Sequence, residues 1–520
     1  MPRALATTLC LLLLAPSARG QQQGAEPVLC PLETHPPQPV YRFAEVQAAL
    51  LARDFDRLEA VFDELQADSR VPGVSRGRYV SYQESLGWLG YLKAGHLDAW
   101  VAAKPESSRA LSARGKARIS WAWEARGYGW AREVTEEGWR VMRERLLLAK
   151  ADLERAMMLD PRSHAAPAAL ITVAMGLSLG RDKAFEYLRR AEAADPTEAV
   201  AHEKMVTFLL PKWFGGERDA LEFARAAVAA TPQEPNRYLL VILAHEQLTS
   251  DLPHDAQMRY FQQPAVRQEV AQAFERLRAA YPIDWYVLGK QAEFARQLGD
   301  LAGRLAALQE SVDLGDTDAM FRLARIIDRN VAGTPPDLVR AARLLCRAAH
   351  AGHGEAKAQL AAFLLEGRGG VPRDPARAVT LLREAAAEGA PDALYLLGCV
   401  TYYGEAGVRR DPAAGRELVK RAFDVGHIEA RGLVGLWLLE AGDGRRGIDL
   451  LQEAVRQGGR RAAVRLGRLV ESGDLRVQRD LGIAADFYRD GANLGDDEAR
   501  ACLLDLLTLH PQLRRPGDPR

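Results

Sequence analysis

A repeat with a period of 37 residues is the feature that most constrains this chain. Six glycines that precede runs of small residues are spaced 37, 37, 37, 32 and 37 residues apart. They are Gly315, Gly352, Gly389, Gly426, Gly458 and Gly495. An alanine follows each glycine after four residues, and a leucine or valine follows after eight. A unit this short cannot bury its own apolar face, so the pattern predicts stacked units that share a continuous core.

Each unit has the pattern of two antiparallel helices. An aspartate lies 15 residues before the next glycine, at Asp337, Asp374, Asp411, Asp443 and Asp480. Aspartate caps the free N–H groups of a helix start, and glycine ends a helix at little conformational cost. The 32-residue unit has lost five residues ahead of Asp443, so we expect the deletion in the connection between its helices. The predicted fold class is an all-α solenoid of stacked helix pairs.

A second rhythm precedes these units, over residues 141–314. Asp160-Pro161, Asp195-Pro196 and Thr231-Pro232 are spaced 35 and 36 residues apart, near the 34-residue tetratricopeptide period. Each proline ends one helix before the next begins, so this region is predicted to hold TPR-like helix pairs. Residues 40–140 are helical in pattern and rich in tryptophan.

The C-terminal units carry a recognisable motif. They contain A-x-x-x-L-G, then a G-x-G-V-x-x-D turn, then a helix ending in A-A-x-x-G, most clearly in Ala356–Gly389 and Ala393–Gly426. This pattern resembles the Sel-1-like repeat family over about residues 315–510. The resemblance implies a TPR-like solenoid and an adaptor role. Two units depart from the motif, because one has Pro335-Pro336 at the glycine turn and the unit Ala430–Gly458 is shortened.

The N-terminal region resembles another family. Trp121-Ala-Trp-Glu-Ala-Arg-Gly127, together with Pro211-Lys-Trp213, is similar to the bacterial domain of unknown function 4034 over residues 40–280. This resemblance implies no activity.

The first 20 residues read as a signal peptide cut before Gln21. Arg3 precedes an apolar run of twelve residues, and Ala18 and Gly20 occupy the −3 and −1 positions. A membrane span needs about 20 apolar residues, so none is expected in the mature chain. We therefore expect a periplasmic or secreted protein, with a flexible lead-in at 21–39 and a disordered tail at 511–520.

Charge and cysteine usage narrow the function classes. Without Arg3 and Arg19 the chain has 67 basic against 69 acidic residues, so nucleic acid is not an expected partner. The mature chain keeps Cys30, Cys346, Cys399 and Cys502 at irregular spacings. This spacing does not suggest a disulfide framework, and we expect most of these thiols to be unpaired.

Sequence motifs for metal or cofactor chemistry are incomplete. His245-Glu246-Gln-Leu-Thr249 begins like H-E-x-x-H, but threonine stands where the second ligand is needed. His350 and His353 fall at a helix end, where we expect both to meet the negative end of the helix dipole, so a capping role is preferred over metal binding. We expect no metal and no cofactor. The tryptophans at 88, 100, 121, 123, 130 and 139 could line a ligand groove, but core packing is the preferred interpretation.

The candidate binding surface is the concave wall formed by the first helix of each C-terminal unit. Positions three and six after the repeat alanine point away from the core centre at 100° per residue. The basic members are Arg322, Arg325, Arg465 and Arg468, and the row ends at Cys502 and Asp505. The apolar members between the arginines include Ala362, Leu396, Cys399 and Leu433, with Trp437 adjacent. This distribution suits a peptide with a hydrophobic centre and acidic flanks. The alternative is that the apolar middle is core between units.

The leading hypothesis is therefore a protein or peptide scaffold that is not an enzyme. The rival hypothesis is an enzyme of unknown reaction, with its site in the aromatic N-terminal region and the repeats as a docking arm. The step from solenoid to binding is analogy, because fold alone does not set function.

Overall fold

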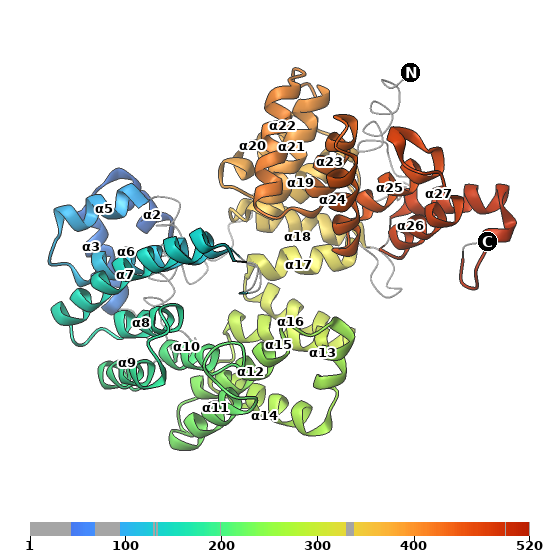
Figure 1. The fold of residues 1–520 in the computed structure, drawn as a ribbon. Helices are drawn as coiled ribbons and strands as arrows, with labels where there is room; N and C mark the ends of the chain where they lie inside the picture. Colours follow the sequence, from blue (N-terminus) through green and yellow to red (C-terminus); the bar gives the residue numbers. More distant parts are fainter. Residues whose placement is uncertain are drawn as a thin grey trace. The chain divides into compact units, whose positions relative to one another are not determined.

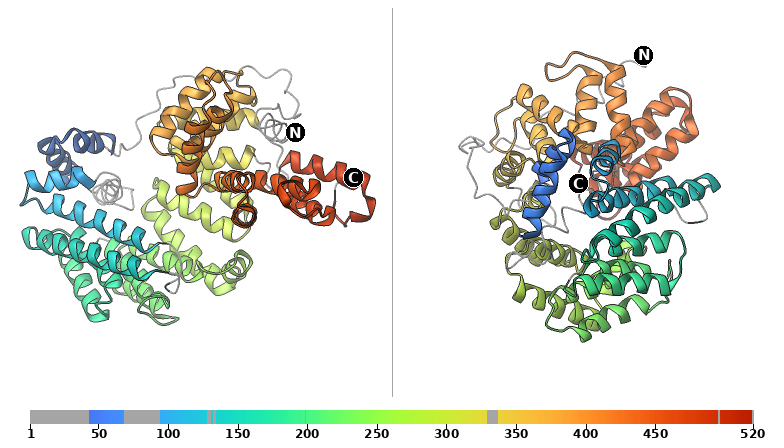
Figure 2. Two further views of the ribbon diagram at one scale, coloured as in Figure 1. Left: turned by 45° about the horizontal axis from the view of Figure 1, so that its top comes forward. Right: turned by 90° about the vertical axis from the view of Figure 1, so that its left-hand side faces the viewer.

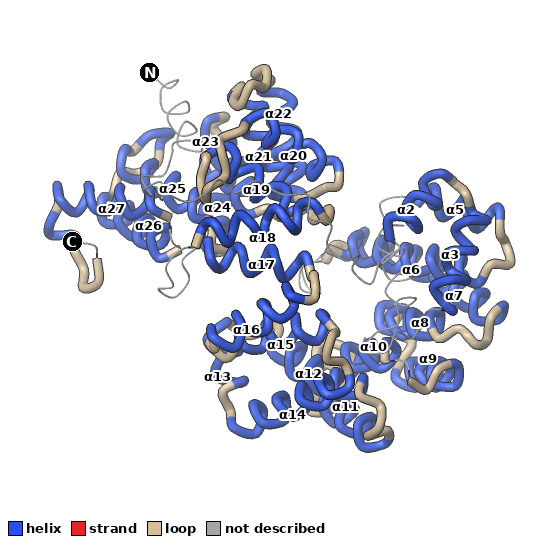
Figure 3. The backbone as a smooth tube through the Cα atoms, turned by 180° about the vertical axis from the view of Figure 1, so that it is seen from behind, coloured by secondary structure: helices blue, strands red, loops and turns tan. Residues whose placement is uncertain are grey.

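The computed structural model describes residues 43–67, 94–127, 131, 134–197, 199–328, 337–494 and 496–518. Within these ranges the regular structure is helical and contains no strand (Figure 3). The chain divides into two compact units, one comprising His35–Leu314 and the other containing Gly315–Arg520 (Figure 1). The predicted all-α solenoid of stacked helix pairs is confirmed.

The N-terminal unit follows the proline rhythm of the sequence. Asp160, Asp195 and Thr231 directly follow the last residues of α7, α9 and α11. Its helices are α2 (Phe43–Ala52), α3 (Phe55–Ala67), α5 (Ala94–Ala103), α6 (Ser108–Arg126), α7 (Glu136–Leu159), α8 (Ala165–Gly176), α9 (Arg181–Ala194), α10 (Val200–Phe208), α11 (Asp219–Ala230), α12 (Asn236–Thr249), α13 (His254–Phe261), α14 (Pro264–Ala280), α15 (Trp285–Gln297) and α16 (Leu301–Asp313).

The C-terminal unit is a run of short helices in pairs (Figure 2). They are α17 (Thr317–Asp328), α18 (Leu338–His350), α19 (Gly354–Glu366), α20 (Pro375–Ala387), α21 (Pro391–Tyr403), α22 (Pro412–Asp424), α23 (Ile428–Glu440), α24 (Gly444–Arg456), α25 (Arg460–Ser472), α26 (Leu481–Asn493) and α27 (Asp497–Leu509). Each odd-numbered helix from α17 to α25 packs against the even-numbered helix that follows it. The odd-numbered helices also contact one another, as α19 does α21 and α25 does α27. Side chains of α17 and α19, and of α21 and α23, meet through His353 and His427. The odd-numbered helices therefore form a row, which we call the inner wall.

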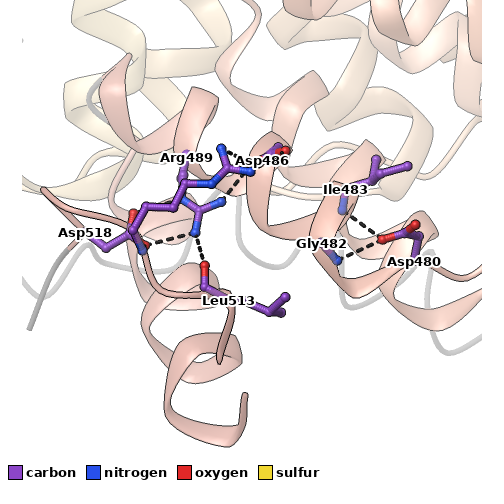
Figure 4. Close-up of polar contacts among 8 residues, drawn as sticks. Asp480, Gly482, Ile483, Asp486, Arg489, Leu513 and Asp518 are labelled. Atoms are coloured by element: carbon purple, nitrogen blue, oxygen red, sulfur yellow. Dashed lines mark hydrogen bonds and ion pairs between the residues drawn. The ribbon is translucent and has the colours of Figure 1, made fainter. Parts of the chain in front are cut away.

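The helix caps lie where the sequence predicts them. The Asp374 carboxylate accepts the N–H of Arg377 at 3.0 Å, and that of Asp480 accepts the N–H groups of Gly482 and Ile483 at 2.9 and 3.0 Å (Figure 4). Gly352 adopts a φ of 89°, in the left-handed region that favours glycine. The same aspartate and glycine therefore begin and end a helix in successive units.

The shortened unit lost its five residues in the connection. Helices α23 and α24 keep 13 residues each, like α21 and α22. Three residues, 441–443, join α23 to α24, whereas eight, 404–411, join α21 to α22. The Pro335-Pro336 departure lies outside the described residues.

The C-terminal tail is ordered further than expected. Leu513 packs against the core of the last helices, and Arg489 donates to its carbonyl oxygen at 2.6 Å. The same guanidinium holds the Asp518 carboxylate, which is 6% exposed, at 2.8 and 2.9 Å (Figure 4). Arg489 lowers the pKa of Asp518 to about 2. The expectation of a disordered tail from Pro511 therefore does not describe residues 511–518, because this ion pair and Leu513 fix them.

The cysteines also differ in part from expectation. Cys399 and Cys502 are thiols, as expected, but Cys346 is disulfide-bonded. Among the helices that the structure describes, none has the length and apolarity to cross a membrane.

Small residues allow close helix crossings. A Cβ atom on Gly398 would lie 2.8 Å from Val419 Cγ2 and 3.1 Å from the carbonyl oxygen of Gly415 on the paired helix. Ala356 and Ala393 are fully buried, as the repeat alignment requires. The spacing of α21 and α22 therefore depends on the missing side chain at Gly398.

We expect Gly398→Ala to lower the free energy of unfolding by about 1–3 kcal/mol, because the added methyl overpacks this crossing. The matched control is Gly444→Ala in α24, where nothing lies within 4 Å of the new Cβ. That substitution should be neutral or stabilise slightly. Thermal melts by circular dichroism measure both, and equal melting of the two variants would contradict the proposed crossing.

Candidate functional site

A row of acidic side chains runs along the starts of the inner-wall helices. The residue before the repeat alanine is acidic in five of six units: Asp318, Glu355, Asp392, Glu429 and Glu498. Arg461 is the exception, and its N–H donates to Glu429 Oε1 at 3.1 Å. Residues at this position can therefore meet between consecutive units, as Glu429 and Arg461 do.

A histidine side chain links consecutive repeat units at two places along this row. His427 Nδ1 accepts the N–H of Ala430 at 3.0 Å, so its Nε2–H is left to donate to Asp392 Oδ1 at 2.9 Å. The His427 ring stacks on Tyr395 with centroids 4.6 Å apart. His353 repeats the arrangement two units earlier, with its cap on Ala356, Asp318 at 3.9 Å and the Phe321 ring centroid at 5.1 Å. The histidine thus joins consecutive units through one cap, one carboxylate and one ring.

His353 and His350 play different roles. His353 Nδ1 accepts the N–H of Ala356 at 3.1 Å, so it caps the start of α19, not the end of α18. His350 lies at the end of α18, with Nδ1 2.9 Å from the carbonyl oxygen of Cys346. The expectation that both meet a negative helix end is correct for His350 and wrong for His353.

No histidine makes this link between the second and third units. Ala390 stands where His353 and His427 stand in the neighbouring units. Glu355 therefore contacts Asp392 instead, and burial together with this second carboxyl raises the pKa of Glu355 to about 8. Burial is the largest influence on Asp392 and opposes its ionisation, but the hydrogen bond and charge of His427, together with Arg325 and Glu355, keep the pKa of Asp392 below its ordinary value. Two carboxyl groups therefore share a proton on the inner wall.

A small cavity of about 30 Å³ opens near the C-terminal ends of α19 and α21. Its lining is Ala362, Leu365, Glu366, Leu396, Cys399, Val400, Glu405 and Arg461. Ala362, Leu396 and Cys399 belong to the apolar middle of the predicted row. Cys399 and Leu433 are buried, whereas Ala362 and Leu396 are partly exposed. The apolar middle is therefore partly core and partly cavity wall.

The two carboxyl groups of the cavity are held in apolar surroundings. Burial raises the pKa of Glu366, although Arg368 Nε lies 2.7 Å from Glu366 Oε2. Burial alone raises the pKa of Glu405. Raised carboxyl pKa values mark places where a cation would be favourable.

The predicted arginines already contact other residues of this chain. Arg322 lies 3.6 Å from Asp318, and Arg468 lies 2.6 Å from Glu498. The guanidinium of Arg325 lies 5.3 Å from the centroid of the Phe321 ring. These side chains lie on α17 and α25, at the two ends of the inner wall.

Arg465 and Trp437 lie deeper than the surface row implies. Arg465 is 5% exposed and donates to the Tyr395 hydroxyl at 3.2 Å, with Glu429 at 3.9 Å. Trp437 is partly exposed, and its ring centroid lies 5.2 Å from that of Tyr402. Glu355, Asp392 and Glu405 were not among the residues predicted from the sequence. The repeat alignment contains the signal for them, because Ala390 stands where other units have a histidine and Glu405 stands where the preceding unit has Arg368.

Part of the tryptophan cluster is core. Trp100 is fully buried, and Trp123 packs edge-on against Trp213 with centroids 5.4 Å apart. Trp88 and Trp130 lie outside the described residues.

Two other tryptophans are exposed and covered by arginines. Trp121 is 40% exposed, with the Arg145 guanidinium 3.6 Å from its ring centroid. Trp139 is 38% exposed, with the Arg126 guanidinium at 5.3 Å. Such cation–π contacts stabilise exposed rings without any ligand.

The incomplete zinc motif forms a packing hub. Buried His245 contacts Tyr260 Oη at 2.7 Å through Nδ1 and Glu269 at 3.0 Å through Nε2, and burial lowers its pKa. Glu246 binds Lys290 at 2.6 Å. Thr249 donates to the carbonyl oxygen of His245 at 2.9 Å. Across the described chain, no group of three or more potential ligands could hold a metal ion.

Family comparisons agree with this architecture. The model for the domain of unknown function DUF4034 matches residues 42–180, and the Sel1 repeat model matches residues 177–196, 317–353, 354–389, 391–427 and 460–496. The chain carries Sel1 repeats behind a DUF4034 domain. The unit 428–459, with the shortened connection, is not among the matched Sel1 repeats. No curated protein matches the chain.

Solved structures with low similarity include two repeat proteins. A protective antigen of uropathogenic Escherichia coli with an SLR fold is 17% identical, with a TM-score of 0.33, covering 79% of this chain and 92% of that chain. A Sel1 repeat protein from Oxalobacter formigenes is 18% identical, with a TM-score of 0.33, covering 48% and 96%.

The shared proton at Glu355 predicts a pH dependence. A carboxyl with a raised folded pKa contributes stability fully below its unfolded value of about 4.5, and this contribution is lost as the pH rises toward 8. Glu355→Gln cannot ionise, so the variant does not lose this stability as the pH rises. The difference in melting temperature between the variant and wild type should therefore increase by about 2 °C from pH 5 to pH 9. The shift is small because the carboxyl pair is partly solvated. Glu417→Gln, on the exposed face of α22, is the control. A pH-independent difference for Glu355→Gln would contradict the shared proton.

Proposed function

We propose that this chain is a periplasmic or secreted scaffold that binds a peptide or protein segment along the inner wall of its C-terminal unit. Sel1 repeats support protein–protein interaction as the general role, and stacked helix pairs provide extended surfaces for it. The observation that carries the proposal is the cavity on the inner wall, where positions of the apolar row meet carboxyl groups with raised pKa values. An apolar wall with a few fixed polar groups is the usual composition of a binding site.

The proposed compartment rests on two observations. Residues 1–20 have the three-part pattern of a signal peptide, and Cys346 is disulfide-bonded. Disulfides persist in oxidising compartments and are rare in the cytosol.

A thiol count tests the compartment. The mature chain has four cysteines, of which Cys399 and Cys502 are thiols. We expect two thiols to react with dithionitrobenzoate in denatured, unreduced protein recovered from its native host, and four after reduction. Mass spectrometry of the same sample should give an N-terminus at Gln21. Four reactive thiols without reduction, or an intact Met1, would contradict a secreted protein.

Peptide display on the purified mature chain tests the binding role. We expect a set of enriched peptides whose affinity falls at least about tenfold in Ala362→Phe, because the phenyl ring fills the cavity. Ala414→Phe, on the exposed face of α22, adds the same ring away from the inner wall and should leave affinity unchanged. The absence of enriched peptides, or equal binding by both variants, would overturn the proposal.

A further inference from the structure

Glu405 is presented to the cavity by a fixed turn. Gly404, Ala406 and Gly407 all have positive φ, of 77°, 52° and 79°. The N–H of Glu405 donates to the Val400 carbonyl at 3.0 Å, and its own carbonyl accepts from the N–H of Val408 at 2.9 Å. A non-glycine residue with positive φ stores strain, and such strain is typical of functional sites. The backbone therefore fixes the position from which the Glu405 side chain extends.

The equivalent residue of the preceding unit is a cation. Arg368 lies 37 residues before Glu405, in the turn between α19 and α20. Its guanidinium binds Asp328 at 2.8 Å and Glu366 at 2.7 Å, and lies 4.1 Å from the centroid of the Phe363 ring. In that unit the chain supplies its own positive charge between an aromatic ring and two carboxylates.

The unit that contains Glu405 does not repeat this arrangement. Within the described part of the chain, the Glu405 carboxylate has neither an ion pair nor a hydrogen bond. Arg461 also lines the cavity, but its guanidinium hydrogen-bonds Tyr395 and is attracted to Glu429. Glu366 is held by Arg368. The charge that remains uncompensated in the cavity is therefore the negative charge of Glu405.

The size of the cavity restricts the cation. A volume of about 30 Å³ admits one or two water-sized groups. The ammonium group at the end of a lysine meets this limit while its methylene stem stays outside, whereas a planar guanidinium is larger. Ala362, Leu396 and Val400 provide an apolar wall for the methylenes.

We propose that the partner segment inserts a lysine side chain into this cavity, with its ammonium group bound by Glu405. This inference rests on the proposed function and deepens it by naming the anchor residue of the partner. It replaces the acidic flanks suggested by the arginine row, because Arg322 and Arg468 already contact carboxylates, Arg465 is buried and Arg325 lies over the Phe321 ring.

The test uses one fluorescein-labelled synthetic peptide taken from the display selection, and its analogue with norleucine in place of the anchor lysine. Norleucine keeps the stem and removes the charge. We expect the norleucine analogue to bind wild type about tenfold more weakly than the lysine peptide does. Against Glu405→Gln the two peptides should bind about equally, because the counter-ion of the lysine is gone.

Two further variants complete the design. Glu405→Arg places the arginine of the preceding unit in the turn and should abolish binding of the lysine peptide, because the site then carries its own cation. Glu417→Gln, an exposed glutamate on α22, removes one charge away from the inner wall and should bind like wild type. Glu405→Gln removes a half-buried charge, so its melting temperature should equal or exceed that of wild type.

The possible failures are distinguishable. Enriched peptides that lose affinity in Ala362→Phe but lack lysine, or that bind Glu405→Gln and wild type with the same lysine preference, overturn the lysine anchor and leave the inner-wall scaffold standing. Enrichment of acidic peptides does the same. Peptides that ignore Ala362→Phe overturn the proposed function and the lysine anchor together.

Discussion

The close crossing of paired helices is the constraint on which the C-terminal unit depends. Gly398, Gly435 and Gly467 occupy the same position in three successive units. A Cβ on Gly435 would lie 2.8 Å from the carbonyl oxygen of Gly447, and one on Gly467 would lie 2.6 Å from the Tyr488 ring. Since packed interiors tolerate little added volume, this position fixes the distance between the two helices of each pair. That distance in turn sets where the next helix of the inner wall begins and which side chains meet across the step.

The repeat alignment predicted the fold because the same local interactions begin and end the helices of every unit. Asp374 begins a helix and Gly352 ends one for reasons contained within a few residues of each. The deletion ahead of Asp443 was placed correctly for a similar reason, because a packed helix cannot lose five residues and a surface connection can. Predictions of this kind need only the chain near the residue concerned.

The candidate site could not be predicted in the same way, since its pairings join different units. A helical wheel places Arg465 away from the core centre, yet the side chain is buried and reaches Tyr395, 70 residues earlier. In a solenoid both sides of an inner-wall helix have neighbours, so a position that faces away from its own pair faces another unit. Likewise, Arg322 and Arg468 look like available charges until their carboxylate partners are known. The prediction of a disordered tail differs from the structure for the same reason. The Arg489–Asp518 ion pair joins residues 29 positions apart, and no sequence pattern connects them.

The positions where the units differ from one another carry the most information about function. His353 and His427 satisfy the acidic residue of the preceding unit, whereas Ala390 leaves Glu355 and Asp392 together. Arg368 satisfies the carboxylates beside it, whereas Glu405 adds another. Both departures fall on the third unit, both cost stability by bringing carboxyl groups into apolar surroundings, and neither is needed for the stacking of the helices. Interactions that break a local rule without a structural gain are expected where a partner completes them. The third unit of the inner wall is therefore the place where this chain is least complete by itself.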